Sequence, residues 1–474
     1  MSSPTKQPEA GKMPKIDLAV RGALWFGPLK GAGQSAGKSA AAAKSALKGG
    51  LSARGQQLKG RLVDVFVAKG KIMALAPAGD LNLRAAKEID AAGLVLLPSL
   101  TDVHVHLREP GQEYKEDIAS GLGAAAFGGF ANIMCMANTR PVNDTASVTE
   151  LMQDKARRAW PDGPRLFPIG ALTKGLKGQE LAPMAELKDA GCKAVSNDGR
   201  PVESSELFRR AMEYASDLGL IVIDHCEDPF LAPATGMNEG EVSSRLGLPA
   251  QPDVAEAIQV ARDVLLAEYL GVPVHLAHVS CEKSVALIRF AKARGVDVTA
   301  ETCPHYLTLT DDEAVGYSAL AKVSPPLRPR ADVDALIDAL AEGVIDMLAT
   351  DHAPHAAHEK EVEFDQAPCG ISGLDTALAT TWELVRAGRL PFDAFVRAWT
   401  SAPCKRFGLP LNTFAPGDPA DFVLFDQDAS WTVGADTMHS KSKNTPLFGR
   451  PLRGRVVAHF LAGKMVIGGV SSGA

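Results

Sequence analysis

Two histidines separated by one residue, His104 and His106, are the strongest chemical feature of the sequence. Residues two apart in a β-strand point to the same face, so both imidazoles would project together. Neutral imidazole is a common metal ligand. Because such pairs also occur where no metal is bound, the pair indicates a metal site only if other ligands reach the same place.

Further ligand-type side chains stand where other expected strands end: Asp198, His225, His278 and Asp351. Imidazole and carboxylate ligands suit Zn²⁺, and a catalytic zinc keeps one coordination position open. Singly, each residue could cap a helix, hold a turn or bond a backbone carbonyl; together they favour a metal site. His275, on the same strand as His278, is a competing candidate that we interpret as a structural histidine.

The elements that would position these residues lie between residues 100 and 351. Eight short apolar runs alternate there with longer stretches of helical periodicity, such as Ser204–Leu218 and Ala255–Tyr269. Alternating strands and helices predict a parallel sheet, and eight units suit a closed (β/α)8 TIM-like barrel, whose active sites lie at the carboxyl ends of the strands. An open doubly wound sheet is the alternative, but no glycine-rich fingerprint follows the first strand. The runs are Val103–Leu107, Asn132–Met136, Leu166–Ile169, Lys193–Ser196, Leu220–Asp224, Val274–Ala277, Val296–Glu301 and Asp346–Thr350.

Strand patterns return on both sides of this region. They cover residues 16–26, 62–67 and 71–76 near the start, and 421–425 and 456–461 after two helical stretches, 374–386 and 392–400. We expect the two groups to pair into a small discontinuous β-sandwich. The predicted organisation is a disordered N-terminus (1–14), two sandwich parts (15–98 and 411–474) and the barrel (99–410).

Residues 28–60 form an unusual insertion in the first sandwich part. The segment is rich in Ala, Gly, Ser and Lys, and no acidic residue occurs from Leu18 to Val63. It has too few large apolar residues to build a core. Two interpretations stay open: a flexible or partly helical surface insertion, or a basic arm for an acidic partner surface.

Composition bounds the protein class. The 474 residues are 46% hydrophobic and 22% charged, with a net charge of −6, as in ordinary soluble enzymes and without a case for nucleic-acid binding. No apolar run of about 18 residues predicts a membrane span. Seven widely spaced cysteines without a CxxC motif argue against disulfides and for buried thiols. We therefore expect a cytoplasmic protein.

Several runs resemble the type I (bacterial) dihydroorotases of the amidohydrolase superfamily. The run DVHVHLREPGQEYKED, Asp102–Asp117, is similar to the family's first-strand motif almost throughout, and DHAPH at Asp351–His355 is equally specific. The resemblance covers about residues 61–465 and implies a barrel flanked by a β-sandwich. Other matching runs are GGF (128–130), NTRP (138–141), NDGRPV (197–202), HCED (225–228), HVS (278–280), ETCPHYL (301–307), PPLR (325–328) and SKSKNTP (440–446).

The resemblance assigns roles to the ligand candidates. His104, His106 and Asp351 would hold one zinc ion, and His225 and His278 a second where it is present. Asp198 would bridge them, although related hydrolases use a carboxylated lysine, for which Lys193 is the alternative here. One or two zinc ions are implied.

The resemblance also implies a substrate pocket. Arg108 would pair with a substrate carboxylate, a contact that suits the forked guanidinium. The other implied contacts are Asn138, Ser324, His355, Cys369 and Gly370. Five positions depart from the family pattern, and two of them, Ser324 and Cys369, put the shape of the pocket in question; the others are Ser99, Ala137 and Asp375.

The implied reaction is the reversible cyclisation of N-carbamoyl-L-aspartate to L-dihydroorotate in de novo pyrimidine (UMP) biosynthesis. Asp351 would carry the proton, and residues 353–370 would form a loop that closes over the site. A hydantoinase or allantoinase, or a non-catalytic homologue that serves as a partner of aspartate transcarbamoylase, are the alternatives. Implied partners are the small-molecule substrate, further copies of the chain and aspartate transcarbamoylase.

Overall fold

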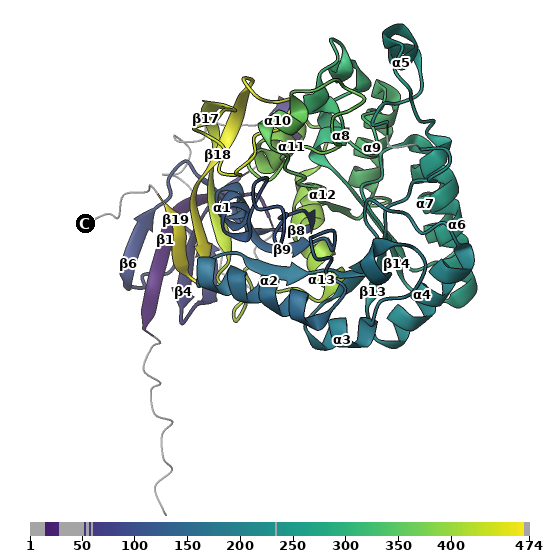
Figure 1. The fold of residues 1–474 in the computed structure, drawn as a ribbon. Coiled ribbons are helices and arrows are strands. Elements are labelled where there is room, and N and C mark those ends of the chain that lie inside the picture. The colour runs from purple at the N-terminus through teal and green to yellow at the C-terminus, as the bar shows by residue number, and fades with distance from the viewer. Residues whose placement is uncertain (1–14, 28–51, 54–55, 58–59, 233–234, 469–474) are drawn as a thin grey trace, which may run out of the picture.

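The computed structural model describes residues 15–27, 52–53, 56–57, 60–232 and 235–468 (Figure 1). The N-terminus predicted to be disordered and most of the basic insertion lie outside the described residues. Within the insertion, β2 (Ser52–Ala53) and β3 (Gln56–Gln57) pair antiparallel.

The middle of the chain is an α/β structure built on parallel strands. Three strands pair in the order β10-β9-β8, and six more in the order β11 to β16. A single parallel bridge between Val105 and His352 links β8 to the segment after β16. Each of the eight predicted runs overlaps one of these strands, and Ile169, the last residue of the third run, separates β10 from β11, which no run predicted. The bounds are β8 (Leu100–Val105), β9 (Phe130–Cys135), β10 (Arg165–Pro168), β11 (Gly170–Ala171), β12 (Ala194–Ser196), β13 (Ile221–Asp224), β14 (Val274–Leu276), β15 (Val298–Thr302) and β16 (Met347–Leu348).

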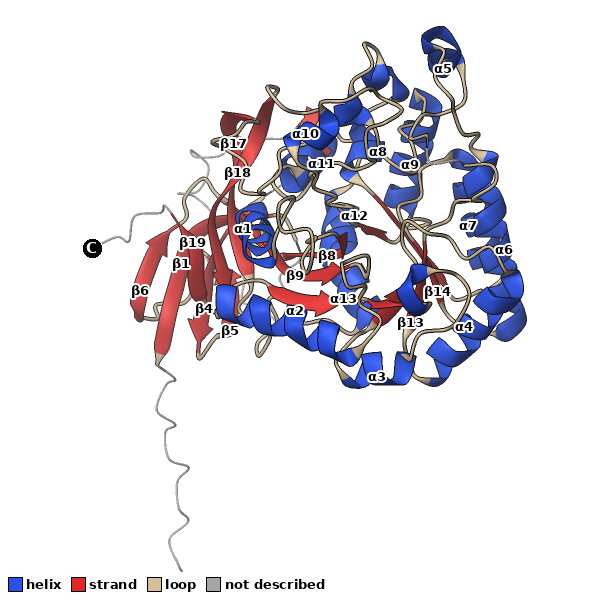
Figure 2. Ribbon diagram, viewed as in Figure 1, coloured by secondary structure: helices blue, strands red, loops and turns tan. Residues whose placement is uncertain are grey.

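Helices surround these parallel strands on the outside (Figure 2). The sequence ends them with recognisable signals: the Ser204 side chain caps α4 by accepting from the Leu207 amide, and Gly271 ends α6 in a left-handed conformation. The longer helices are α1 (Ile118–Gly128), α2 (Ala146–Ala159), α4 (Ser205–Asp217), α6 (Val254–Leu270), α7 (Glu282–Ala293), α9 (Arg330–Glu342) and α11 (Ala377–Arg386). The shorter ones are α3 (Met184–Asp189), α5 (Glu241–Leu246), α8 (Pro304–Thr308), α10 (Ala357–Lys360), α12 (Phe392–Val396) and α13 (Ala402–Phe407).

Two segments differ from the sequence-based expectation. The helix predicted over 392–400 is α12 followed by a π-helical turn, Arg397–Ser401, which leads into α13. The stretch predicted to be a loop, 353–370, contains the short helix α10, whose Glu359 side chain accepts from the Ala356 amide at its start.

Strands from both ends of the chain form one mixed sheet beside the parallel strands (Figure 1). Across the sheet, the strand order is β19-β18-β17-β7-β1-β4-β5, with β6 paired to β1, and the antiparallel pair β7–β17 joins the two groups. Buried apolar side chains such as Val20, Val65 and Phe422 make its core. The bounds are β1 (Ile16–Trp25), β4 (Arg61–Ala68), β5 (Lys71–Pro77), β6 (Ala85–Asp90), β7 (Val95–Pro98), β17 (Phe422–Thr432), β18 (Pro451–Leu461) and β19 (Lys464–Gly468).

All seven cysteines are free thiols, buried except for the half-buried Cys369, as predicted. Among the described residues, no helix combines the length and the apolar character needed to span a bilayer.

A buried histidine connects the mixed sheet to the first helix of the α/β region. His459 of β18 donates through Nδ1 to the Ala126 carbonyl of α1 at 2.8 Å, and its Nε2 accepts from the Ser99 hydroxyl at 2.9 Å. Burial lowers the pKa of His459 to about 4. The ring is therefore neutral in the folded protein over most of the acidic range.

The burial of a neutral His459 predicts that the free energy of unfolding falls in acid. An unfolded histidine takes up a proton near its ordinary pKa of 6.5, whereas His459 in the folded state does so only near 4. As the pH falls from 6.5 to 4, this one group should remove up to about 3 kcal/mol of unfolding free energy. Denaturant unfolding at several pH values should give a flatter profile for His459→Gln than for the wild type. If the unfolding free energies of the variant and the wild type changed equally with pH, His459 would not be the group that titrates.

Candidate metal centre

The structure brings the six predicted metal ligands to one end of the parallel strands. His104 and His106 lie at the end of β8, Asp198 two residues after β12, and His225 directly after β13. His278 and Asp351 follow β14 and β16, and all six side chains are buried. They converge because the carboxyl ends of parallel strands share one rim.

Asp198 lies between two pairs of histidines. Its Oδ1 is 3.3 Å from His104 Nε2, and its Oδ2 is 3.5 Å from His106 Nε2. On the other side, Oδ1 is 3.5 Å from His225 Nδ1 and 3.6 Å from His278 Nε2. Two sets of three ligands therefore share this one carboxylate.

Asp351 completes the first of these sets. Its Oδ1 is 3.2 Å from His106 Nε2 and 3.5 Å from His104 Nε2. Lys193, the alternative bridge, does not reach this cluster: its side chain is exposed and lines a separate surface cavity with Trp160. Lys193 lies just before β12 begins, whereas Asp198 follows the carboxyl end of that strand, where the cluster forms.

Three of the four histidines have one ring nitrogen tied to an oxygen and the other aimed at the cluster. His104 Nδ1 is 2.7 Å from Glu301 Oε1, and His106 Nδ1 is 2.9 Å from Asn138 Oδ1. His225 Nε2 is 2.8 Å from Glu227 Oε2. Each tied nitrogen carries the proton, because a carboxylate and an amide oxygen only accept. When these rings are neutral, as metal ligands must be, the inward nitrogens are therefore lone-pair donors.

The inward nitrogens fit a divalent cation. His104 Nε2 is buried and has no hydrogen-bond partner. His225 Nδ1 and His278 Nε2 face each other at 2.8 Å. A buried polar atom without a partner is costly, and a cation placed among these nitrogens and the Asp198 oxygens would satisfy them together.

The electrostatics of the cluster agree with this fit. Burial lowers the pKa of His104, but the carboxylates of Asp198, Asp351 and Glu301 outweigh it and hold that pKa well above its ordinary value. Burial raises the pKa of Asp198, but the surrounding imidazoles bring it well below its usual range. The carboxylates thus stay ionised and create a site that attracts positive charge.

Strained backbone occurs at three residues of this rim. Arg108, His278 and Asp351 have φ of 60°, 35° and 45°. Side chains other than glycine rarely adopt this left-handed conformation, so the surrounding packing must hold it. Such strain is typical of functional sites, and here it holds the three side chains in the orientations that face the cluster.

A cavity of about 170 Å³ lies over the cluster, and all six predicted substrate contacts line it. Arg108 is oriented by its Nε bond to the Pro354 carbonyl at 3.1 Å. Ser324 donates to Glu227 at 2.6 Å, so in this structure it belongs to the network that orients His225. The six are Arg108, Asn138, Ser324, His355, Cys369 and Gly370.

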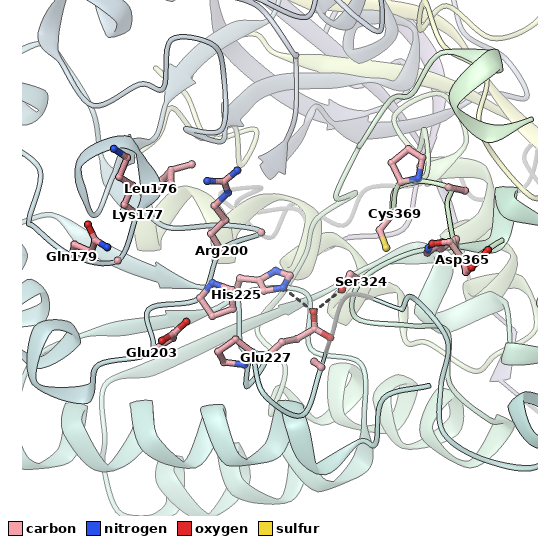
Figure 3. Close-up of a pocket in the computed structure, with 18 residues that line it drawn as sticks. Leu176, Lys177, Gln179, Arg200, Glu203, His225, Glu227, Ser324, Asp365 and Cys369 are labelled. Carbon is pink, nitrogen blue, oxygen red and sulfur yellow. Dashed lines mark hydrogen bonds and ion pairs between the residues drawn. The ribbon is translucent and has the colours of Figure 1, made fainter. Parts of the chain in front are cut away.

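This cavity adjoins a larger one of about 850 Å³, which opens toward the surface (Figure 3). The two share Gly199, His225, Ser324 and Cys369. In Figure 3 the Glu227 carboxylate lies between His225 and Ser324, and the Arg200 guanidinium points away from these three side chains. The larger cavity offers a path from the surface to the cluster.

Several supporting residues were not singled out from the sequence. Glu301 bonds both His104 and the buried His275, whose Nε2 lies 3.0 Å from Oε2. Glu227 bonds His225. Asn444, far along the chain, accepts from the His355 amide and donates to the Gly370 carbonyl. All three lie within runs that resemble the family pattern, and that resemblance was the one sign in the sequence of a role at the site.

Glu301 allows a test of the metal centre. Its carboxylate fixes the His104 tautomer, and Glu301→Gln keeps the shape but removes the charge. We expect divalent-metal affinity to fall about 10- to 100-fold, as for other partners of metal-ligating histidines. Competition with a chelator would measure it, with Glu342→Gln, an exposed acid on α9, as the control. Equal affinity in both variants would count against Glu301 as the orienting group.

Comparisons with known proteins agree with this architecture. The sequence model of the family described as "Dihydro-orotase-like" matches residues 93–284. The dihydroorotase of Geobacter metallireducens is 48% identical over 410 residues, covering 85% of this chain and 95% of that protein. The dihydroorotase of Syntrophus aciditrophicus is 46% identical over 424 residues, covering 89% and 99%.

A solved structure, the L-hydantoinase (dihydropyrimidinase) from Arthrobacter aurescens, has the same fold, with a TM-score of 0.79 at 24% identity over 96% of this chain and 97% of that one. At that identity the likeness concerns the fold. The identity to the curated relatives over nearly their whole length is decisive for the family. The chain belongs to the dihydroorotases, within a fold shared by cyclic amide hydrolases.

Proposed function

We propose that this protein is a dihydroorotase, which interconverts N-carbamoyl-L-aspartate and L-dihydroorotate plus water in de novo pyrimidine biosynthesis. One observation carries the proposal: Arg108 lines the same 170 Å³ cavity as Asp198 and three of the four histidines around it. A metal cluster alone would serve many hydrolases. A fixed guanidinium beside it adds a site for a substrate carboxylate.

The donor set supports zinc as the metal, with one or two ions for each chain. His104, His106 and Asp351 would hold one ion, His225 and His278 a second, and Asp198 would bridge them. When bound, zinc supplies Lewis-acid chemistry, which polarises a carbonyl group and makes water more acidic.

Asp351 is the proposed proton carrier. Burial raises its pKa, but His104 and His106 outweigh this and keep it below the ordinary value, so the carboxylate is ionised at neutral pH. In the hydrolytic direction Asp351 accepts a proton from the attacking water and passes it to the leaving ring nitrogen. In ring closure the proton moves in the opposite direction, from the attacking nitrogen to Asp351 and then to the departing water.

The remaining cavity residues position the substrate. Arg108, Asn138 and His355 would hold its carboxylate, and fixing that group sets the distance from the reacting amide to Asp351. Ser324, Cys369 and Gly370 would shape the wall around the ring. A side chain at Gly370 would meet the Ala353 carbonyl oxygen at 2.6 Å, so the wall depends on glycine.

We extend the proposal to the fold and its domains. The Val105–His352 bridge supports a closed (β/α)8 barrel over residues 99–410. The mixed sheet supports a discontinuous β-sandwich made of residues 15–98 and 411–474.

We also propose that the segment 353–370 closes over the site and that copies of the chain associate in the cytoplasm. Aspartate transcarbamoylase is the proposed protein partner.

Asp351→Asn tests the proton carrier. The amide keeps the shape but cannot accept a proton, so turnover should fall at least about 100-fold, in line with the contribution of general acid–base catalysis. The zinc content of the purified variant, measured alongside the rate, should stay substantial because the histidines and Asp198 are intact. A near-normal rate would rule out this role.

Arg108→Met tests the substrate class. Loss of the guanidinium should raise KM for dihydroorotate about 10- to 100-fold, the usual scale for a charged hydrogen bond. Activity toward hydantoin, which lacks the carboxylate, should not fall. An unchanged KM for dihydroorotate, or a wild-type preference for hydantoin, would contradict the proposed substrate.

A further inference from the structure

A buried lysine lies behind the substrate pocket. Only 7% of Lys115 is exposed, although lysines rarely sit inside proteins without a partner. Its Nζ is 3.2 Å from His355 Nδ1 and 2.9 Å from Glu359 Oε1. The ion pair with Glu359 explains how the charge is tolerated. The contact with His355 has a further consequence.

The lysine decides which His355 nitrogen carries the proton. A lysine ammonium can only donate, so Nδ1 of His355 must accept and the ring proton lies on Nε2. The other side of the ring agrees, because Nε2 is 2.9 Å from the Cys369 carbonyl oxygen, which can only accept. Burial and the charges of Arg108, Lys115 and Lys360 lower the pKa of His355 to about 2, so the ring is neutral.

The protonated Nε2 lies beside the guanidinium. It is 3.3 Å from Arg108 Nη2. Both groups are then donors, so they form no hydrogen bond with each other. Two donors at one edge of the same cavity suit a negatively charged oxygen.

The lysine itself is held from several directions. Glu359 accepts from the Ala356 amide at 3.0 Å and from the Tyr114 hydroxyl at 3.3 Å. The Ser442 hydroxyl donates to the Lys115 carbonyl oxygen at 2.6 Å. The position of the ammonium is thus fixed independently of any substrate.

We propose that Lys115 is a positioning residue that locks His355 in the Nε2–H tautomer, and that this N–H, which the Cys369 carbonyl oxygen accepts in this structure, is shared with the carboxylate of a bound substrate. In the opposite tautomer, a lone pair on Nε2 would face the carboxylate and repel it. The substrate part of this inference rests on the proposed function; the tautomer part does not.

Lys115→Met removes the donor and keeps most of the apolar stem. In zinc-loaded protein with ¹⁵N-labelled histidine, wild-type His355 should show a protonated Nε2 and an unprotonated Nδ1, with the signal assigned by its loss in His355→Gln. The variant should shift toward the Nδ1–H form. Its KM for dihydroorotate should rise about tenfold or more, with kcat changed less than about threefold, since one hydrogen bond to the substrate is affected.

Lys441→Met is the matched control. Lys441 is a nearby lysine, 38% exposed, that pairs with Asp117. The Lys441→Met substitution should leave the His355 tautomer, KM and kcat unchanged.

Three outcomes would overturn the proposal: an Nδ1–H tautomer in the wild type, the same tautomer in wild type and Lys115→Met, or a fall in kcat at constant KM. The wild-type spectrum decides the tautomer even if the variant does not fold. Because the spectrum needs no turnover, a protein that shows the locked tautomer but no dihydroorotase activity would refute the proposed function and leave the tautomer assignment standing.

Discussion

The burial of one carboxylate among four imidazoles is the constraint on which this site depends. Asp198 lies within 3.6 Å of a nitrogen from each of four histidines. Removing these groups from water is unfavourable unless a cation joins them or the histidines take up protons. Glu301, Asn138 and Glu227 each accept the outer N–H of one histidine. These contacts leave the inner nitrogens of the neutral rings as lone-pair donors, an arrangement that suits a metal ion.

The sequence was sufficient to predict eight of the nine parallel strands and the convergence of the six candidate ligands. Short apolar runs separated by helical periodicity identify buried parallel strands, and their ends must share one rim. The β6 strand was missed because it is largely exposed and contains Lys87 and Glu88. The residues that orient the ligands were also missed, since their role depends on contacts between distant segments. Glu301 acts on His104 across 197 positions of the chain, and no spacing rule connects them.

Three of the five departures from the family pattern have hydrogen-bond partners. Ser99 donates to His459, and Ser324 donates to Glu227. Asp375 accepts from the amides of His439 and Ser440, in the segment that leads to Asn444. Each of these polar side chains has entered a hydrogen-bond network beside the site or at the junction with the mixed sheet. The described contacts of Ala137 give no reason for its small side chain.

Asn444 has a consequence for how the protein acquires its pocket. Its side chain accepts from the His355 amide and donates to the carbonyl groups of Ala353 and Gly370, so a residue near the end of the chain holds the wall that faces the cluster. The parallel strands and all six candidate ligands precede Asn444 in the sequence. During synthesis on the ribosome, the groups proposed to bind metal are therefore part of the chain before the residue that holds this wall of the pocket has been added.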